Sequence, residues 1–281
     1  MITPPSDAAV AAEDFLRTHH DGRPGRQSEG GEALLTADGR SSYRILADRV
    51  AGARRVLDLG CADGRLLELL AEAGAEALAG IDLSEGELAF ARRRPALAGA
   101  DLRCGRAQRL PFGDGAFDAV VSHMALMLMA DVEHVAAEAA RVLAPGGVLA
   151  VAVGGGAVEG QARELFLTLA RPYFRATSAP APTPRLGDRR TRSRDGLDEI
   201  LTPHGFAPVT WETVTVDPRG TPERVWDVMA FTVYDMADLG AEQTAELRTR
   251  FLAESRALVA ADGRLPCGML IHHATTRLAG R

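Results

Sequence analysis

Apolar residues in the middle of the chain form two kinds of pattern that follow one another. Short apolar runs of strand length alternate with longer segments in which apolar residues recur at helical spacing. Such alternation over about a hundred residues predicts βαβ units and a parallel sheet that helices cover on both faces. The expected strands are residues 56–60, 77–83, 100–104, 117–123 and 148–153, and the expected helices between them are residues 64–73, 84–94 and 131–143.

The two ends of the chain are less regular. The first thirty or so residues are rich in turn formers and predict a loose arm, or a helix followed by a loop. Ser193 and Gly205 have the properties of a helix N-cap and a helix C-terminal stop. The later elements that we expect are a helix at 160–174, a Pro- and Arg-rich loop at 178–196, strands at 206–218 and 267–278, and a helical insertion at 221–261.

Together these elements predict an α/β protein with a Rossmann-like, seven-stranded and mostly parallel sheet, with one antiparallel strand at its end. Helices would cover both faces, and further helices would form a lid. We expect an N-terminal arm and lid segment at 1–42, a core at 43–155, and a third segment at 156–281 that supplies lid helices and the last two strands.

Composition narrows the class of protein further. The 281 residues are 46% apolar and carry a net charge of −6, which disfavours a dedicated nucleic-acid binder. The three cysteines have no paired spacing, so neither a disulfide framework nor a CxxC zinc site is expected. No secretory leader or membrane span is visible, and we expect a cytoplasmic protein. All 32 basic residues are arginine, a bias that fits specialised metabolism encoded in a GC-rich genome.

The segment VLDLGCADGRLLELL at 56–70 is the strongest local signal. A buried strand ends at an acidic residue, a glycine turn follows, and a helix begins at once. This arrangement lets backbone approach a ligand at the carboxyl end of the first strand. The glycine spacing is not that of a dinucleotide fingerprint, and Asp63 would repel a pyrophosphate. A cationic or zwitterionic cofactor would tolerate Asp58 and Asp63 better.

A second acidic position follows about twenty residues later, a spacing known from nucleotide sites. In GIDLS, Asp82 ends the second expected strand, where a carboxylate accepts hydrogen bonds from both hydroxyls of a ribose. Each of the two signals is weak alone, because a strand-terminal aspartate often only caps a helix. Their combination at this separation indicates a cofactor that contains a ribose.

The chain resembles the class I S-adenosylmethionine-dependent methyltransferases, specifically the small-molecule branch of ubiquinone and menaquinone methylases. The resemblance rests on VLDLGCADG, GIDLS, GRAQRLPFGDGAFDAVVSH and RVLAPGGVLAVAV, in the family's order, and covers about residues 43–155. It implies S-adenosyl-L-methionine as cofactor and S-adenosyl-L-homocysteine as product, with LAPGG as a turn before the fifth strand. The implied cofactor residues are Asp58, Gly60, Cys61 and Ala62 at the methionyl and ribose portion, Asp82 at the ribose hydroxyls, Leu83 against the adenine, Ala107 and Gln108 at the adenine edge, and Ser122 beneath the methionyl tail.

Two positions depart from the family pattern. Ala62 replaces the middle glycine of the motif and adds one methyl group near the ligand. Arg106 stands where the family commonly has an aspartate that accepts the adenine amino group, and arginine accepts no hydrogen bond. Gln108, a backbone carbonyl or apolar packing would then hold the adenine.

His123 is the candidate catalytic base, because it ends the fourth expected strand and an ordinary histidine pKa suits proton transfer. The alternative is a histidine that only forms a hydrogen bond near the ligand. His19 and His20 would lie on an arm over the pocket or in solvent. His272 and His273 would alternate across the closing strand, and no metal site is expected.

The candidate substrate contacts are Met127, Tyr173 and Trp226. Met127 belongs to the run HMALMLM, which predicts either a soft substrate wall or core packing. The two aromatic residues lie in the segment that varies within the family. Other aromatic residues of that segment for which substrate contact is expected in part are Phe166, Trp211, Phe231 and Tyr234.

The predicted reaction is methyl transfer to an oxygen, nitrogen or carbon atom of a small molecule, driven mainly by alignment in a pocket that excludes water. The alternative is a cofactor-binding cyclase or rearrangement enzyme of the same fold that does not methylate. The arginines at 185, 189, 190, 192 and 194 form either a solvated loop or a site for an anionic substrate, carrier protein or RNA. We expect no DNA or membrane partner, disfavour carrier protein and RNA, and keep a homodimer as one alternative.

Overall fold

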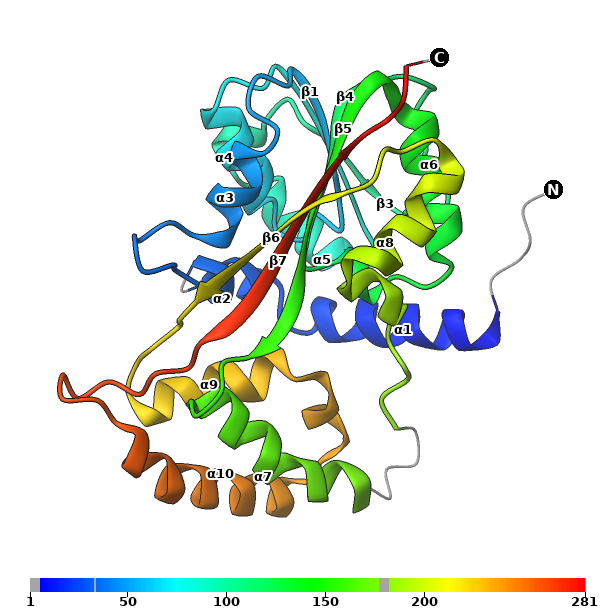
Figure 1. The fold of residues 1–281 in the computed structure, drawn as a ribbon. Coiled ribbons are helices and arrows are strands. Elements are labelled where there is room, and N and C mark those ends of the chain that lie inside the picture. Colours follow the sequence, from blue (N-terminus) through cyan, green and yellow to red (C-terminus); the bar gives the residue numbers. More distant parts are fainter. Residues whose placement is uncertain (1–5, 33, 177–181, 281) are drawn as a thin grey trace.

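The computed structural model describes residues 6–32, 34–176 and 182–280, and these form one layered α/β fold (Figure 1). The described chain contains a seven-stranded sheet, as predicted. All neighbouring strands are parallel except where one strand pairs antiparallel with both of its neighbours. The order across the sheet is β3 (Asp101–Cys104), β2 (Ala77–Asp82), β1 (Arg55–Leu59), β4 (Phe117–His123), β5 (Leu143–Ala157), β7 (Met269–Arg277) and β6 (Thr210–Val216).

Two details of the sheet differ from the expectation. The antiparallel strand β7 is not the edge strand, because β6 pairs along its outer side. In addition, LAPGG is not a turn before the fifth strand but the beginning of β5, which starts at Leu143. Phe117 of β4 pairs with Leu143, and Ala119 pairs with Val148, so the register shifts between these two pairs. The turn-forming residues of LAPGG therefore form a bulge at the start of β5.

Helices cover both faces of the sheet, and alternate residues of each strand face one layer or the other. In β4, Val120 packs into the core beneath one layer, while Ala119 and Val121 pack into the core beneath the other. One layer contains α6 (Val132–Val142) and α8 (Arg194–Leu201), and the other contains α3 (Ser42–Asp48), α4 (Arg65–Glu72) and α5 (Glu85–Ala91) (Figure 1). Ser193 caps α8 by accepting from the Gly196 N–H at 3.2 Å, as predicted.

A separate group of helices lies beyond the carboxyl ends of the parallel strands (Figure 1). It consists of α7 (Ala162–Ala176), α9 (Pro222–Thr232), η5 (Tyr234–Asp238), α10 (Ala241–Glu254) and η6 (Ser255–Leu258). These helices have their own apolar core, centred on Phe166, Trp226 and Phe251. Helices were expected in both of these segments, at 160–174 and 221–261, and we call this group the lid. Residues 178–181 of the expected loop lie outside the described chain.

The N-terminal arm is mostly helical and lies along the ends of the parallel strands (Figure 1). It contains α1 (Asp7–Asp21) and α2 (Arg26–Glu32). Asp21 attaches the end of α1 to the core, because its Oδ1 accepts from the Ser84 hydroxyl at 2.6 Å and from the Gly86 N–H at 3.0 Å. The arm therefore covers the edge at which the chain reversal between β1 and β4 predicts a ligand site.

Candidate active site

The turn after β1 forms a narrow backbone cradle. Gly60 and Gly64 have φ values of 72° and 81°, which favour glycine. A Cβ atom at Gly60 would lie 2.4 Å from Cβ of Ala125, so a side chain would fill this space. Ala62 also adopts the left-handed region, with φ at 46°, where a residue with a Cβ atom carries about 1–2 kcal/mol of strain.

Two carboxylates stand beside this cradle, Asp58 buried and Asp82 half-buried. Asp82 accepts from the Ala62 N–H at 2.8 Å and from the Ser84 N–H at 2.9 Å, which fixes its orientation. Burial raises the pKa of Asp82, and these two hydrogen bonds oppose the increase. Burial and the nearby Asp82 raise the pKa of Asp58 well above its ordinary value. Oδ1 of Asp58 has no hydrogen-bond partner among the described residues, so the site has an unused polar atom for a ligand.

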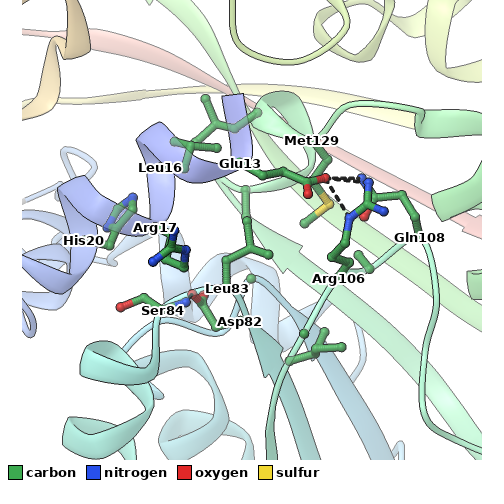
Figure 2. Close-up of a pocket in the computed structure, with 16 residues that line it drawn as sticks. Glu13, Leu16, Arg17, His20, Asp82, Leu83, Ser84, Arg106, Gln108 and Met129 are labelled. Atoms are coloured by element: carbon green, nitrogen blue, oxygen red, sulfur yellow. Dashed lines mark hydrogen bonds and ion pairs between the residues drawn. The ribbon is translucent and has the colours of Figure 1, made fainter. Parts of the chain in front are cut away.

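A small pocket of about 90 Å³ lies next to Asp82, between the end of β2, the loop at 105–108 and α1 (Figure 2). Oε1 of Glu13 lies 2.7 Å from Nη2 and 2.9 Å from Nε of Arg106. Gln108 donates to the Ala130 carbonyl at 2.7 Å and lies 3.5 Å from the same carboxylate oxygen. The loop at 105–108 has Arg106 where the family commonly has an aspartate. Glu13 of α1 places a carboxylate beside this position.

A larger cavity of about 350 Å³ adjoins the small pocket, and its volume is within the usual range of about 300–1,000 Å³ for ligand sites. Asp58, Cys61 and Ala62 line one part of it, and side chains of the lid line another. The residues that line both spaces are His20, Gly60, Asp82, Ala125 and Leu128. The two spaces therefore form one site with a narrow branch of about 90 Å³ and a wider branch of about 350 Å³.

His123 lines the larger cavity at the end of β4. Its Nε2 shares a hydrogen bond with Oγ of Ser42 at 2.8 Å, and its ring stacks on Tyr43 with 3.9 Å between ring centroids. Burial, with a smaller contribution from His273, lowers the pKa of His123 to about 3. The imidazole is therefore neutral at neutral pH but is a weak base, and its orientation is fixed by Ser42 and Tyr43.

Most of the predicted cofactor residues lie together around these two spaces. Ser122 is the exception: its hydroxyl donates to the Leu59 carbonyl at 2.9 Å and accepts from the Leu126 N–H at 3.1 Å, and it lines neither space. Its predicted place beneath the methionyl tail is corrected to a buried structural role. The predicted residues that do line the site are Asp58, Gly60, Cys61, Ala62, Asp82, Leu83, Ala107 and Gln108.

The predicted substrate contacts are only partly brought together. Met127 lines the larger cavity, and its sulfur accepts from the Gly154 N–H at 3.1 Å. Trp226 lines neither space, because it is enclosed in the lid core. The centroid of its ring lies 5.6 Å from the ring centroid of Phe166. Tyr173 lies on α7, packs against the same core and also lines neither space. Both predicted contacts are corrected accordingly.

Some of the other histidines and aromatic residues line the site, and others lie in the sheet. His20 lines both spaces and lies 3.3 Å from the hydroxyl of Tyr234, while Phe231 lines the larger cavity. His272 stacks against Trp211 on the sheet, and His273 is buried with no hydrogen-bond partner among the described residues. The latter histidines therefore belong to the sheet and not to the site.

The arginine-rich loop is not one basic surface. Arg190, in η3 (Arg189–Arg192), forms ion pairs with Asp188, Glu133 and Glu199. Arg192 instead lines the larger cavity. The same loop therefore provides both a structural ion-pair network and a side chain of the site.

Of the residues that line the site, His20 and Arg192 were weighed from the sequence, whereas Glu13, Leu16, Arg17 and Arg163 were not. α1 contributes Glu13, Leu16, Arg17 and His20 to the small pocket. Their spacing places them on one helix face, and this periodicity is a signal that could have identified them. Arg163 carries no such signal, and Arg192 was named only as one of five arginines in a loop, because only tertiary structure brings α7 and η3 to the cavity.

Comparisons with known proteins agree with this geometry. Residues 57–151 match a family model described as a methyltransferase domain. A malonyl-acyl-carrier-protein O-methyltransferase from Methylococcus capsulatus is 32% identical over 253 residues, which are 88% of this chain and 82% of the relative. A demethylmenaquinone methyltransferase from Thermus thermophilus is 43% identical over 102 residues, 35% of this chain and 46% of the relative.

Solved structures share the fold. The (4+2)-cyclase SpnF superposes with a TM-score of 0.56 at 22% identity and covers 100% of this chain and 99% of its own. A phosphoethanolamine N-methyltransferase 2 from Haemonchus contortus, solved with S-adenosyl-L-methionine, has a TM-score of 0.54 at 16% identity, over 96% of this chain and 60% of its own.

The chain therefore belongs to the class I S-adenosylmethionine-dependent methyltransferases. It is an enzyme, and its cofactor is S-adenosyl-L-methionine. No helix of the described chain has the length and apolarity that crossing a bilayer requires.

Proposed function

We propose that the protein methylates an oxygen atom of a small organic molecule that binds in the larger cavity. The observation that carries this proposal is the junction of the two spaces at Gly60, Ala125 and Leu128. A cofactor in one branch and an acceptor in the other would meet there, and such alignment lowers the barrier of a transfer reaction by removing entropy before the step.

The choice of an oxygen atom is supported by two relatives. The Methylococcus relative is named an O-methyltransferase, and so is a fatty-acid O-methyltransferase from Mycolicibacterium smegmatis that is 40% identical over 34% of this chain and 35% of the relative. The expectation of specialised metabolism is supported by a 27-O-demethylrifamycin SV methyltransferase from Amycolatopsis mediterranei, 38% identical over 38% of this chain and 43% of the relative.

The cradle and its carboxylates suit S-adenosylmethionine. When bound, this cofactor supplies a methyl group on a positively charged sulfur. Asp82 would accept from the ribose hydroxyls, and the unpartnered Oδ1 of Asp58 would accept from a donor of the methionyl portion. Glu13, which is held by Arg106, would accept from the adenine amino group in place of the aspartate that the loop lacks.

His123 would contribute a fixed wall and a hydrogen bond and not a strong base, because its pKa of about 3 makes proton removal by the imidazole unfavourable. The enzyme then depends on an acceptor that is already nucleophilic. With cofactor and acceptor bound, the lid and α1 would help to exclude water from the site, so that the acceptor would be the main nucleophile near the cofactor.

Calorimetry with S-adenosylmethionine and S-adenosylhomocysteine tests the cofactor part, and mass spectrometry after incubation with candidate acceptors tests the transfer. An acceptor that gains one methyl group while S-adenosylhomocysteine accumulates would support the proposal. Binding of the cofactor without any methylated product, but with an isomerised or cyclised acceptor, would favour the alternative of a non-methylating cyclase. Absence of cofactor binding would contradict both.

A further inference from the structure

His20 lies where the two spaces of the site meet. Of the described residues that line both spaces, only His20 and Asp82 have side chains that can take up a proton. Asp82 already accepts from the Ala62 and Ser84 N–H groups, and it is the proposed partner of the ribose hydroxyls. His20 is therefore the titratable side chain at this junction that remains to act on an acceptor.

Both nitrogens of the His20 ring face a polar atom. Nε2 lies 3.3 Å from the hydroxyl of Tyr234 in η5, and Nδ1 lies 3.6 Å from Oε1 of Glu87 in α5. The second distance is within ion-pair range but is longer than a hydrogen bond. The arm, the core and the lid, which are far apart in the sequence, thus meet at one imidazole ring.

Glu87 is a buried carboxylate with one oxygen left for the ring. Its side chain is 1% exposed, and its Oε2 accepts from the Gly25 N–H at 2.9 Å. Its Oε1 has no hydrogen-bond partner among the described residues, and a proton on Nδ1 of His20 would supply the missing donor. A carboxylate behind one ring nitrogen fixes the tautomer, so that the other nitrogen can accept a proton, and it stabilises the imidazolium that then forms.

Tyr234 extends this contact into the wider branch of the site. It lines the larger cavity and does not line the small pocket. Burial raises the pKa of its phenol, and the nearby Asp82 and Glu87 add to the increase. The phenol therefore keeps its proton at neutral pH, and it can release one to His20 only as it receives another from the cavity.

The preceding histidine of α1 has a different environment. The ring centroid of His19 lies 6.0 Å from that of Phe15, 5.8 Å from that of Phe231 and 5.0 Å from that of Tyr234. Its buried Nε2 has no hydrogen-bond partner among the described residues, and burial and the adjacent His20 lower its pKa to about 4. His19 joins the arm to the lid by packing, so this contact does not by itself require the polar partners of His20.

The charged and titratable groups around His20 are of both signs, and three of them are carboxylates. They are Arg17, His19 and Asp21 of α1, Asp82 of β2, Glu87 of α5 and Tyr234 of η5. A positive charge that forms on the ring is attracted by these carboxylates.

We propose that His20 is the general base for acceptors with a neutral hydroxyl group, that Tyr234 passes the proton to it, and that Glu87 positions the ring. We call these three residues the His20 relay. The inference rests on the proposed function and extends it, because a weakly basic His123 alone limits the reaction to acceptors that are already nucleophilic.

The relay accounts for every proton and electron pair of the transfer. The acceptor oxygen forms the new O–CH₃ bond as the C–S bond breaks, and the electron pair of the broken bond stays on the sulfur. The hydroxyl proton of the acceptor moves to the oxygen of Tyr234, and the proton of Tyr234 moves to Nε2 of His20. The positive charge lost at the sulfur reappears on the imidazolium, next to Glu87. An acceptor that is already ionised releases no proton and does not need the relay.

Imidazole NMR tests the arrangement without turnover. The full-length protein is isotopically labelled at its histidine nitrogens and saturated with S-adenosylhomocysteine, and the His20 signals are identified by their loss in His20→Gln. Glu87→Gln removes the charge behind Nδ1 and should shift the His20 ring signals. The control is Glu85→Gln, which is exposed on the same helix and should leave them as in the wild type. His20 signals that do not respond to Glu87→Gln would overturn the proposal.

Turnover of two matched probes tests the chemistry. At pH 8, 4-nitrophenol is ionised, whereas 4-methylphenol is neutral like an ordinary phenol. With saturating cofactor, His20→Gln should lower kcat for 4-methylphenol by about 10²-fold or more, the size of a general-base contribution. Its effect on 4-nitrophenol should be at least about tenfold smaller, and Tyr234→Phe should show the same difference between the probes. His134→Gln, exposed on α6, should behave as the wild type with both probes.

The outcomes separate this inference from the proposed function. If the wild type methylates 4-nitrophenol but not 4-methylphenol, or if His20→Gln lowers both rates equally, the relay is wrong and the proposed function stands. If neither phenol is methylated, the response of the His20 signals to Glu87→Gln decides. If no acceptor of any kind gains a methyl group, the proposed function fails first.

Discussion

Glu13 and Arg106 form an ion pair with 2.7 Å between Oε1 and Nη2, and this pair joins α1 to the loop after β3 (Figure 2). The two residues are far apart in the sequence and lie on the same side of the small pocket. Because both side chains are mostly covered, the pair orients the carboxylate more firmly than a surface ion pair would. The arm is thereby made part of the wall of the small pocket, the proposed cofactor site.

Glu13→Gln should weaken S-adenosylhomocysteine binding about tenfold, or about 1.4 kcal/mol, because an uncharged amide accepts more weakly and no longer holds Arg106. Calorimetry measures this change. S-inosylhomocysteine, which carries a carbonyl in place of the adenine amino group, should bind the wild type less tightly, and Glu13→Gln should lose most of that preference. Asp7→Asn, on the same helix but outside the pocket, is the control; an unchanged preference in Glu13→Gln would refute the assignment.

Asp82→Ala should weaken binding of both S-adenosylmethionine and S-adenosylhomocysteine by at least about tenfold, because the carboxylate both receives ribose hydroxyls and holds the Ala62 and Ser84 N–H groups. Asp101→Ala on the neighbouring strand β3 removes an exposed carboxylate and should have little effect. Equal affinities of the two variants would show that the ribose lies elsewhere.

Ala62→Gly should raise the free energy of unfolding by about 0.5–1 kcal/mol, since glycine adopts a φ of 46° without the strain that a Cβ atom causes. Urea unfolding of the cofactor-free protein measures this. Ala53→Gly is a suitable comparison because Ala53 is not among the described residues with positive φ, and there the substitution should destabilise. A loss of stability in Ala62→Gly would mean that its methyl group is packed favourably.

The stability of the protein should decrease as the pH falls from about 7 to 5. Burial lowers the pKa of His273 to about 4, below the ordinary 6.5, so the unfolded chain binds a proton that the folded chain excludes. Between pH 7 and pH 5, the protonation of His273 alone should lower the free energy of unfolding by about 1–2 kcal/mol. His273→Gln should remove that part of the pH dependence in urea unfolding, whereas the exposed His134→Gln should not. The same slope in all three proteins would mean that His273 is protonated in the fold.

His123→Gln should lower kcat by less than about tenfold, since a hydrogen bond to Ser42 remains possible and no strong base is lost. Loss of a true general base would instead cost about 10²–10⁴-fold. For the wild type we expect a flat kcat from pH 6 to 9 with an acceptor that is ionised throughout. A rise of kcat through pH 6.5 that disappears in the variant would restore His123 as the base.

The alternating core was predictable because its signals are local. The fourth strand was located at the correct bounds, and the first three strands within about one residue, since apolar runs and glycine turns alone determine where such strands begin and end. That Asp58 and Asp82 line one cavity followed from the same logic, because parallel strands end at one edge of the sheet.

The acceptor branch was not predictable in the same way. An amphipathic pattern shows that a helix has an apolar face but not which neighbour covers it, so Trp226 was assigned to substrate although Phe166 and Phe251 enclose it. Arg163 was not identified, and Arg192 was named only among five arginines of one loop, because their places in the cavity depend on how α7 and η3 pack. Glu13, Leu16 and Arg17 of α1 were missed although their helical spacing is a local signal.

The two branches of the site have separate origins along the chain. Residues that would hold the cofactor come mainly from the strand ends at 58–62, 82–84 and 105–108, while α7 and α9 in the lid add Leu167, Val228, Met229 and Phe231 to the wall of the larger cavity. A lineage can therefore exchange the lid side chains and acquire a new acceptor while its methyl donor stays the same. Substrate range in this enzyme is then a trait that can evolve, and be engineered, almost independently of the chemistry.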